Sequence, residues 1–167
     1  MLSLILVMVA SVFFAYCSER TSGPSLGGSP VRWDIFLVLM VVIMTLFSGL
    51  RTGYNDTATY ISGFLNADSV STFLSDPDNL NLLHNPLFYF VTSVFRSLTS
   101  NYHFYLLAFA IFNTILLVRF LRRYATQGNF AFIIYLFFAI GIFTFSMAAL
   151  KQITATALLT LAIPALV

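Results

Sequence analysis

Charged residues are scarce in this chain. Aspartate, glutamate, lysine and arginine together make up 8% of its 167 residues, whereas soluble domains carry about 25%. Hydrophobic residues make up 59%, and a soluble fold of this length has too little polar surface to cover so much apolar material. The net charge of +2 does not indicate a nucleic-acid partner. The composition therefore predicts a membrane protein that binds no nucleic acid.

Cysteine and histidine are also nearly absent. Cys17 is the one cysteine of the sequence, so no internal disulfide bond can form, and we expect it to be a buried apolar thiol. The two histidines, His84 and His103, have no partner at metal-ligand spacing. The sequence therefore predicts neither a metal site nor another cofactor.

Long apolar runs make up most of the chain. A helix needs about 20 residues to cross a bilayer. Five runs approach that length, and they cover residues 2–17, 33–50, 102–121, 130–148 and 150–167. No Lys or Arg precedes the first run and no small-residue cleavage site follows it, so we interpret it as an uncleaved helix. The predicted fold is all-α: a polytopic transmembrane helix bundle of about five spans, forming one membrane domain over residues 1–167.

A polar segment, residues 51–101, separates the second run from the third. Two short amphipathic helices are expected within it, over residues 57–65 and 69–74. The segment is acidic, because it contains four aspartates and two arginines. The aspartates are Asp56, Asp68, Asp76 and Asp78.

A further helix is predicted over residues 86–98, which is too short to span. Asn85 is a favourable N-cap and Pro86 a favourable first helical residue. Apolar side chains share one face of this helix and polar side chains the other. The apolar face comprises Leu87, Phe90, Val91, Val94, Phe95 and Leu98, and the polar face Tyr89, Thr92, Ser93, Arg96 and Ser100. This pattern is typical of a helix that lies in the membrane interface.

The distribution of charge supports this layout. If residues 86–98 do not cross, five arginines fall on one side of the membrane and the four aspartates on the other. These arginines are Arg20, Arg32, Arg119, Arg122 and Arg123. The arrangement obeys the positive-inside rule. We therefore predict that the N-terminus and the acidic segment lie outside and that residue 167 lies at the cytoplasmic side.

An acid and a base follow the second run. Arg51 precedes Gly53, which frees the backbone for a turn, and Asp56 comes next. Asp56 could accept a proton from a sugar hydroxyl, and Arg51 could hold a pair of phosphate oxygens. The same residues also fit a solvated loop with an ordinary ion pair, and the spacing alone leaves both interpretations open.

Lys151 and Gln152 begin the last run at its outer end. A lysine at a membrane border can extend its ammonium to the lipid headgroups. Alternatively, a cation at a helix N-terminus would point into the same outer cavity as Arg51 and Asp56. Both the ammonium and the helix N-terminus favour an anionic ligand such as a lipid pyrophosphate.

Short motifs connect these positions to a known family. Leu50-Arg51 ends the second run, and Gly53, Asp56 and Tyr60 form a Gly-x-x-Asp-x-x-x-Tyr string. Further on come Asn85-Pro86-Leu87-Phe88-Tyr89, a basic stop at Arg122, and Leu150-Lys151-Gln152-Ile153-Thr154-Ala155. With the uncharged first helix, these motifs resemble the EpsG family, Wzy-like membrane proteins of bacterial exopolysaccharide, capsule and O-antigen assembly.

The resemblance covers nearly all of the chain, with two departures. Tyr54-Asn55 stands where the family usually has Gly-Thr, and Lys151 stands where it usually has Arg. A lysine keeps the charge but lacks the bidentate fork of arginine. Members of the family are typically longer, so this chain is expected to be the N-terminal half of a longer protein.

The layout also resembles membrane glycosyltransferases of the GT-C type. These enzymes place an acidic residue in the first large outer loop and interfacial helices after it. Their His-Pro-Pro-Leu-Tyr-Tyr-like strings are similar to the run from His84 to Tyr89. This similarity makes His84 a candidate substrate-binding residue.

The family resemblance implies a protein of the bacterial cytoplasmic membrane that acts on polyprenyl-pyrophosphate-linked oligosaccharides. Membrane lipid and other polysaccharide-assembly proteins would be its further partners. In a polymerase, Asp56 would be the base on the acceptor hydroxyl, while Arg51 and Lys151 would neutralise the leaving pyrophosphate. Tyr60 and Gln152 would orient the sugar or the lipid head.

Two other functions remain open at this stage. A transporter or flippase for lipid-linked sugars should show charged residues or broken helices near the membrane midplane, and the predicted spans contain almost no ionisable residue. A non-catalytic membrane subunit of a polysaccharide-assembly complex is the second alternative. Neighbouring genes for glycosyltransferases and a flippase would favour glycan assembly.

Overall fold

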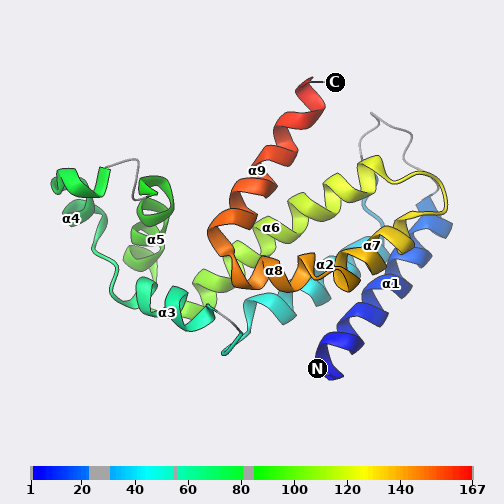
Figure 1. Cartoon of the computed structure of the whole chain (residues 1–167), viewed down its shortest axis with the longest axis horizontal. Helices are drawn as coiled ribbons and strands as arrows, with labels where there is room; N and C mark the ends of the chain where they lie inside the picture. Colours follow the sequence, from blue (N-terminus) through cyan, green and yellow to red (C-terminus); the bar gives the residue numbers. More distant parts are fainter. Residues whose placement is uncertain (1, 23–30, 55, 81–84, 167) are drawn as a thin grey trace.

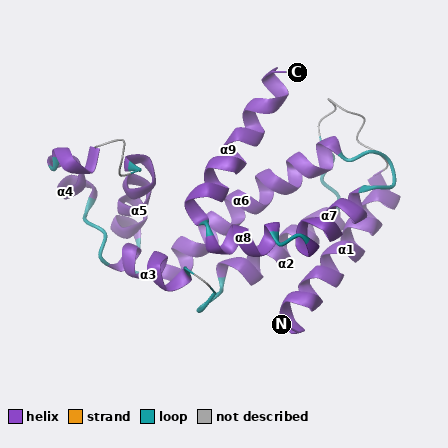
Figure 2. Cartoon of the chain, in the orientation of Figure 1, coloured by secondary structure: helices purple, strands orange, loops and turns teal. Residues whose placement is uncertain are grey.

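A computed structural model describes residues 2–22, 31–54, 56–80 and 85–166 of the chain (Figure 1). Their regular elements are α1 (Leu2–Ser22), α2 (Ile35–Gly49), α3 (Thr57–Leu65), α4 (Val70–Ser75), the 3-10 helix η1 (Pro77–Leu80), α5 (Pro86–Leu98), α6 (Tyr102–Tyr124), α7 (Phe130–Ala139), α8 (Ile142–Ala148) and α9 (Leu150–Leu166). Figure 2 shows helices and loops and no strand in these residues. The all-α prediction is confirmed.

The helices have the lengths and composition of a membrane protein. Among the described helices, α1 and α6 are long and apolar enough to cross a bilayer. The consecutive helices α7 and α8 make a third candidate if they form one bent span, and α2 and α9 are shorter apolar helices. All five predicted runs are therefore helical, while the count of five spans stays a prediction.

One predicted span differs from the structure. Residues 130–148 were expected to form a single helix, but α7 ends at Ala139 and α8 begins at Ile142, with a bend of 52° between them. Gly141 has a φ of +82°, which a continuous right-handed helix does not permit. The left-handed glycine therefore breaks the span that its apolar sequence predicts.

The long helices pack side by side around an apolar core. The second helix, α2, packs against both α1 and α6, α1 packs against α7, and α6 packs against α9 (Figure 1). Leu37, Met40 and Met44 are buried at helical spacing on one face of α2. Val42 and Leu46 on the same helix are exposed, so the outer surface of the bundle is apolar too, as lipid contact requires.

Gly49 lies at a close approach between α2 and α6. A Cβ atom at this position would lie 2.8 Å from the Cα atom of Leu107 and 2.7 Å from its Cδ1 atom. A backbone atom cannot yield as a flexible side chain can, so we expect Gly49→Ala to push the two helices apart. The free energy of unfolding should fall by about 1–3 kcal/mol, measured as a lower melting temperature in detergent.

Gly63 provides the matched control for this substitution. It lies inside α3, and a Cβ atom there would meet nothing within 4 Å. Because alanine favours a helix over glycine, Gly63→Ala should leave the melting temperature unchanged or slightly higher. Equal effects of the two substitutions would contradict close packing at Gly49.

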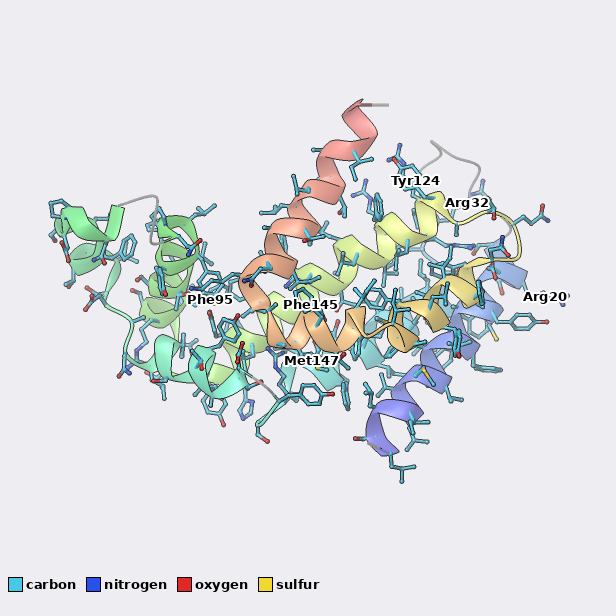
Figure 3. The ribbon with its side chains drawn as sticks, in the orientation of Figure 1. Arg20, Arg32, Phe95, Tyr124, Phe145 and Met147 are labelled. Carbon is cyan, nitrogen blue, oxygen red and sulfur yellow. The ribbon has the colours of Figure 1, made fainter. Side chains whose placement is uncertain are left out.

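Arginines gather at one end of the molecule. Figure 3 shows Arg20, Arg32 and Tyr124 at the end opposite Phe95 of α5. At the arginine-rich end, the Glu19 carboxylate accepts hydrogen bonds from the backbone N–H groups of Phe130 (2.9 Å) and Ala131 (3.4 Å). Its Oε1 atom also lies 4.0 Å from Nη1 of Arg122. Glu19 therefore joins α1, α6 and the start of α7, a role that the sequence did not indicate.

Helices α3, α4 and α5 gather at the other end, beside the start of α6 (Figure 1). The helix expected over residues 86–98 is present with those bounds as α5. Asn85 occupies the N-cap position, but the expected side-chain cap is absent and its φ is +53°. Asparagine tolerates this left-handed conformation better than most residues, and its backbone carbonyl accepts hydrogen bonds from Phe88 and Tyr89 instead.

Burial on α5 does not follow the predicted polarity of its two faces. Leu87 and Leu98 on the predicted apolar face are 69% and 73% exposed, whereas Thr92 and Ser93 on the predicted polar face are each 2% exposed. The Thr92 hydroxyl donates to the Phe88 carbonyl (2.9 Å), so burial leaves it satisfied. The small polar side chains therefore pack against the protein. Leu87 and Leu98 are exposed, whereas Val91 and Phe95 of the same apolar face pack, partly buried, against the cluster that includes Tyr105 and Phe109.

Candidate functional site

Arg51 connects three elements just after the end of α2. It is 9% exposed, and its Nε atom donates to the Thr57 hydroxyl at the start of α3 (2.9 Å). Nη1 donates to the Ser48 carbonyl of α2, and Nη2 to the Met147 carbonyl of α8 (3.0 Å). Burial lowers the pKa of the guanidinium, and the nearby Tyr60 and Tyr105 hydroxyls act in the opposite direction. An arginine in this setting keeps its charge.

These three hydrogen bonds leave two of the five N–H donors of Arg51 for other partners. The guanidinium lines a small chamber with room for about one water molecule. Asn113 lines the same chamber, and its buried Oδ1 atom has no partner among the described protein atoms. Arg51 therefore has a structural role and also supplies a positive charge to a small interior chamber whose lining is part polar and part apolar.

Tyr60 caps the start of α9. Its hydroxyl accepts a hydrogen bond from the backbone N–H group of Leu150 (3.0 Å). The first N–H groups of a helix have no partner within that helix, so a hydroxyl from α3 satisfies one of them. Met147, whose carbonyl accepts a hydrogen bond from Arg51, lies three residues before Leu150 near the end of α8 (Figure 3). Arg51 and Tyr60 therefore both fix the junction between α8 and α9.

Lys151 lies against the aromatic start of α5. Its Nζ atom donates to the Tyr89 hydroxyl (3.1 Å) and lies 5.1 Å from the centre of the Phe88 ring and 4.4 Å from that of the Tyr89 ring. Ring faces attract a cation without neutralising it. No carboxylate pairs with Lys151 among the described residues, so its positive charge is uncompensated there.

The three short motifs therefore meet at one place. The motif after α2 contributes Arg51 and Tyr60, the motif at the start of α5 contributes Tyr89, and the motif at the start of α9 contributes Lys151. Phe88 and Tyr60 also touch, with ring centres 6.2 Å apart. We call this region the α8–α9 junction site.

The other predicted site residues do not join the contacts of the junction site. Asp56 is exposed directly before α3, and its side chain makes no cap hydrogen bond to that helix. No ion pair joins Asp56 to Arg51 within the described residues. Gln152 is exposed on α9. His84 lies outside the described residues.

Arg51 and Lys151 line different cavities. Arg51 faces the small chamber, whereas Lys151 lines a larger apolar groove between α5, α6 and α9. The wall between the two includes Asn113 and Thr154, whose side chains form a hydrogen bond of 3.1 Å. Asn113 of α6 thus bonds to the neighbouring α9, as polar side chains within helix bundles of membrane proteins commonly do.

Sequence reasoning missed several partners at the junction site. Thr57 and Tyr89 lie inside motifs that were noted, but nothing in their spacing shows that they would face Arg51 and Lys151. The Met147 carbonyl is a backbone group 96 residues away from Arg51. This carbonyl is available to Arg51 because α8 ends at Ala148, and a continuous apolar run gives no signal that the helix ends there.

The comparison with protein-family models decides the family. The model of the EpsG family matches residues 34–167, from the N-cap of α2 onward. The chain belongs to the EpsG family. Its family and its apolar helices make it an exopolysaccharide-related integral membrane protein. Searches of curated proteins and of solved structures gave no match. Arg51, Tyr60, Tyr89 and Lys151, which meet at the junction site, all lie within the matched region.

Proposed function

We propose that this EpsG protein joins polyprenyl-pyrophosphate-linked repeat units into a polysaccharide at the outer face of the bacterial cytoplasmic membrane. The observation that carries the proposal is the convergence at the junction site. A buried guanidinium (Arg51) and an uncompensated ammonium (Lys151) lie at the start of α9, and an exposed carboxylate (Asp56) precedes α3, the helix whose Tyr60 caps α9. Acid–base and anion-binding groups so close to an apolar bundle suit an amphiphilic, anionic substrate.

The reaction needs a base and a positive field. The acceptor hydroxyl oxygen bonds to the anomeric carbon of the donor sugar, while the bond from that carbon to the pyrophosphate oxygen breaks. Asp56 accepts the hydroxyl proton, and the polyprenyl pyrophosphate leaves with the electron pair of the broken bond. Lys151 stabilises the charge that grows on the leaving group, and Arg51 adds to the positive potential from the chamber behind it. Tyr60 and Gln152 orient the sugar or the lipid head.

The outer location follows from charge. We propose five spans, with the GT-C-like segment of α3, α4 and α5 outside and the arginine-rich end in the cytoplasm. Cysteine labelling tests this topology. In a Cys17→Ser background, an impermeant thiol reagent added outside should label Asp68→Cys before α4 but not Gln127→Cys between α6 and α7. Both positions are exposed, so labelling at Gln127→Cys alone would invert the topology.

Deletion of the gene tests the function itself. Cells without the protein should lose long polymer and accumulate single lipid-linked repeat units on the outer face, and the complete gene should restore the polymer. Accumulation on the inner face would favour the flippase alternative. Normal polymer in the deletion strain would contradict the proposal.

The transporter alternative has one observation in its favour, the break between α7 and α8. Broken helices bind substrates in transporters when charged groups or helix ends meet there. Residues 130–148 include no Asp, Glu, Lys, Arg or His, and Gly141 lies between Ile140 and Ile142 in the chain. The break therefore supplies no charged ligand for an anionic sugar lipid.

A further inference from the structure

The apolar groove beside the junction site has the features of a lipid-chain site. It has a volume of about 650 Å³, within the range of known small-molecule pockets. Its lining is mostly aromatic and aliphatic, from Phe88, Val91 and Phe95 of α5, Phe112 of α6, and Ala155 and Leu158 of α9. An apolar groove on a membrane protein takes up hydrocarbon readily, so the occupant depends on the polar groups at its ends.

Lys151 is the charged group of this groove. It is the second residue of α9, and Leu158 lies seven residues further along the same helix, about 10 Å away at the helical rise. The groove therefore has a cation at one end and hydrocarbon along the rest. Because no described carboxylate pairs with Lys151, the complementary occupant is an anionic head with a long apolar tail.

From this geometry we infer that the groove between α5, α6 and α9 binds the isoprenoid chain of a polyprenyl pyrophosphate, with the first phosphate at Lys151. This inference rests on the proposed function, because it names where the lipid of that substrate lies. The tail contacts Phe88, Val91 and Phe95 on one side and Ala155 and Leu158 on the other. Thr154 lines the groove and forms a hydrogen bond with Asn113. It separates the isoprenoid chain of the lipid from the chamber that Arg51 lines.

Filling the groove provides the test. Ala155 is an exposed position on α9 that lines the groove, so Ala155→Trp adds bulk to the groove without entering the core. Leu158→Trp fills the far end and serves as a second variant. Ala162→Trp is the matched control, because Ala162 is exposed on the same helix but does not line the groove. Melting temperatures in detergent confirm that each protein is folded.

Binding of undecaprenyl pyrophosphate, geranyl pyrophosphate and phosphatidylglycerol to the complete gene product is measured by native mass spectrometry. The native protein and Ala162→Trp should prefer undecaprenyl pyrophosphate. Ala155→Trp and Leu158→Trp should lower its affinity roughly tenfold or more, as expected when a pocket loses room for one or two methylenes, while geranyl pyrophosphate should be affected less. Lys151→Gln should weaken both pyrophosphates.

The outcomes separate the groove from the proposed function. Equal binding of undecaprenyl pyrophosphate by native protein and by both tryptophan variants overturns the inference, even if the native protein makes polymer. Equal affinity for phosphatidylglycerol and undecaprenyl pyrophosphate overturns it as well, since the groove is then an ordinary bilayer-lipid site. Chain-length-dependent binding that tryptophan blocks, in a native protein that makes no polymer, supports the groove and refutes the polymerase.

Discussion

Asp56→Asn in the complete gene is expected to reduce polymer formation by about 100- to 10,000-fold, because a positioned general base contributes that much to a rate. Asparagine keeps the size and hydrogen-bonding capacity of the side chain but cannot accept the proton. Asp56 is exposed and makes no cap hydrogen bond, so the protein should stay in the membrane at its normal level. Polymer amount and chain length are measured in cells that lack their own copy, alongside protein abundance.

Asp68→Asn is the matched control for this variant. Asp68 is an exposed carboxylate between α3 and α4, so its loss removes the same loop charge without removing the proposed base. Polymer should stay close to normal. If Asp56→Asn also gives polymer of normal amount and length, Asp56 is a solvated loop residue and the protein would be better described as a non-catalytic subunit.

Arg51→Ala should have the second large effect, on stability as well as on polymer. The substitution removes three hydrogen bonds from a residue that is 9% exposed. Hydrogen bonds to a charged group contribute about 1.5–3 kcal/mol each, although such values do not add. We expect a loss of at least about 2 kcal/mol in the free energy of unfolding, seen as a lower melting temperature in detergent. Polymer should fall more steeply than protein abundance.

Two companion variants separate the structural role of Arg51 from its charge. Thr57→Val removes one hydrogen-bond partner of Arg51 and keeps the guanidinium. It should therefore lower the melting temperature modestly and leave polymer formation unchanged. Arg51→Lys keeps the charge but cannot reach Thr57, Ser48 and Met147 together, and its melting temperature should lie between those of Arg51→Ala and the native protein. A native melting temperature for Arg51→Ala would contradict the contacts described here.

Hydrophobic pattern and length were enough to predict most helices of this chain. The bounds expected for residues 57–65 and 86–98 are those of α3 and α5, because amphipathic spacing and a proline at the first helical position are local signals. The break at Gly141 was missed, since a single glycine in an apolar run is compatible with a helix. Only the observed φ of +82° shows that the chain turns there.

The sequence predicted several residues of the site, but not which residues they would contact. Short motifs brought Arg51, Tyr60 and Lys151 to attention, but their partners are far away in the chain. The bonds from Arg51 to Met147 and from Tyr60 to Leu150 cross 96 and 90 residues. The sequence also suggested that Arg51 and Lys151 share a cavity, whereas they line two different ones. Such placements depend on how α6 and α9 pack, which local patterns do not encode.

Reconstitution tests the central claim most directly. The complete gene product is placed in liposomes with purified lipid-linked repeat units, and the products are separated by chain length. The polymerase proposal predicts a ladder of growing chains from the native protein, with one polyprenyl pyrophosphate released for each glycosidic bond, and no ladder from Asp56→Asn. Repeat units that stay unjoined with native protein, or an undiminished ladder from Asp56→Asn, would contradict it.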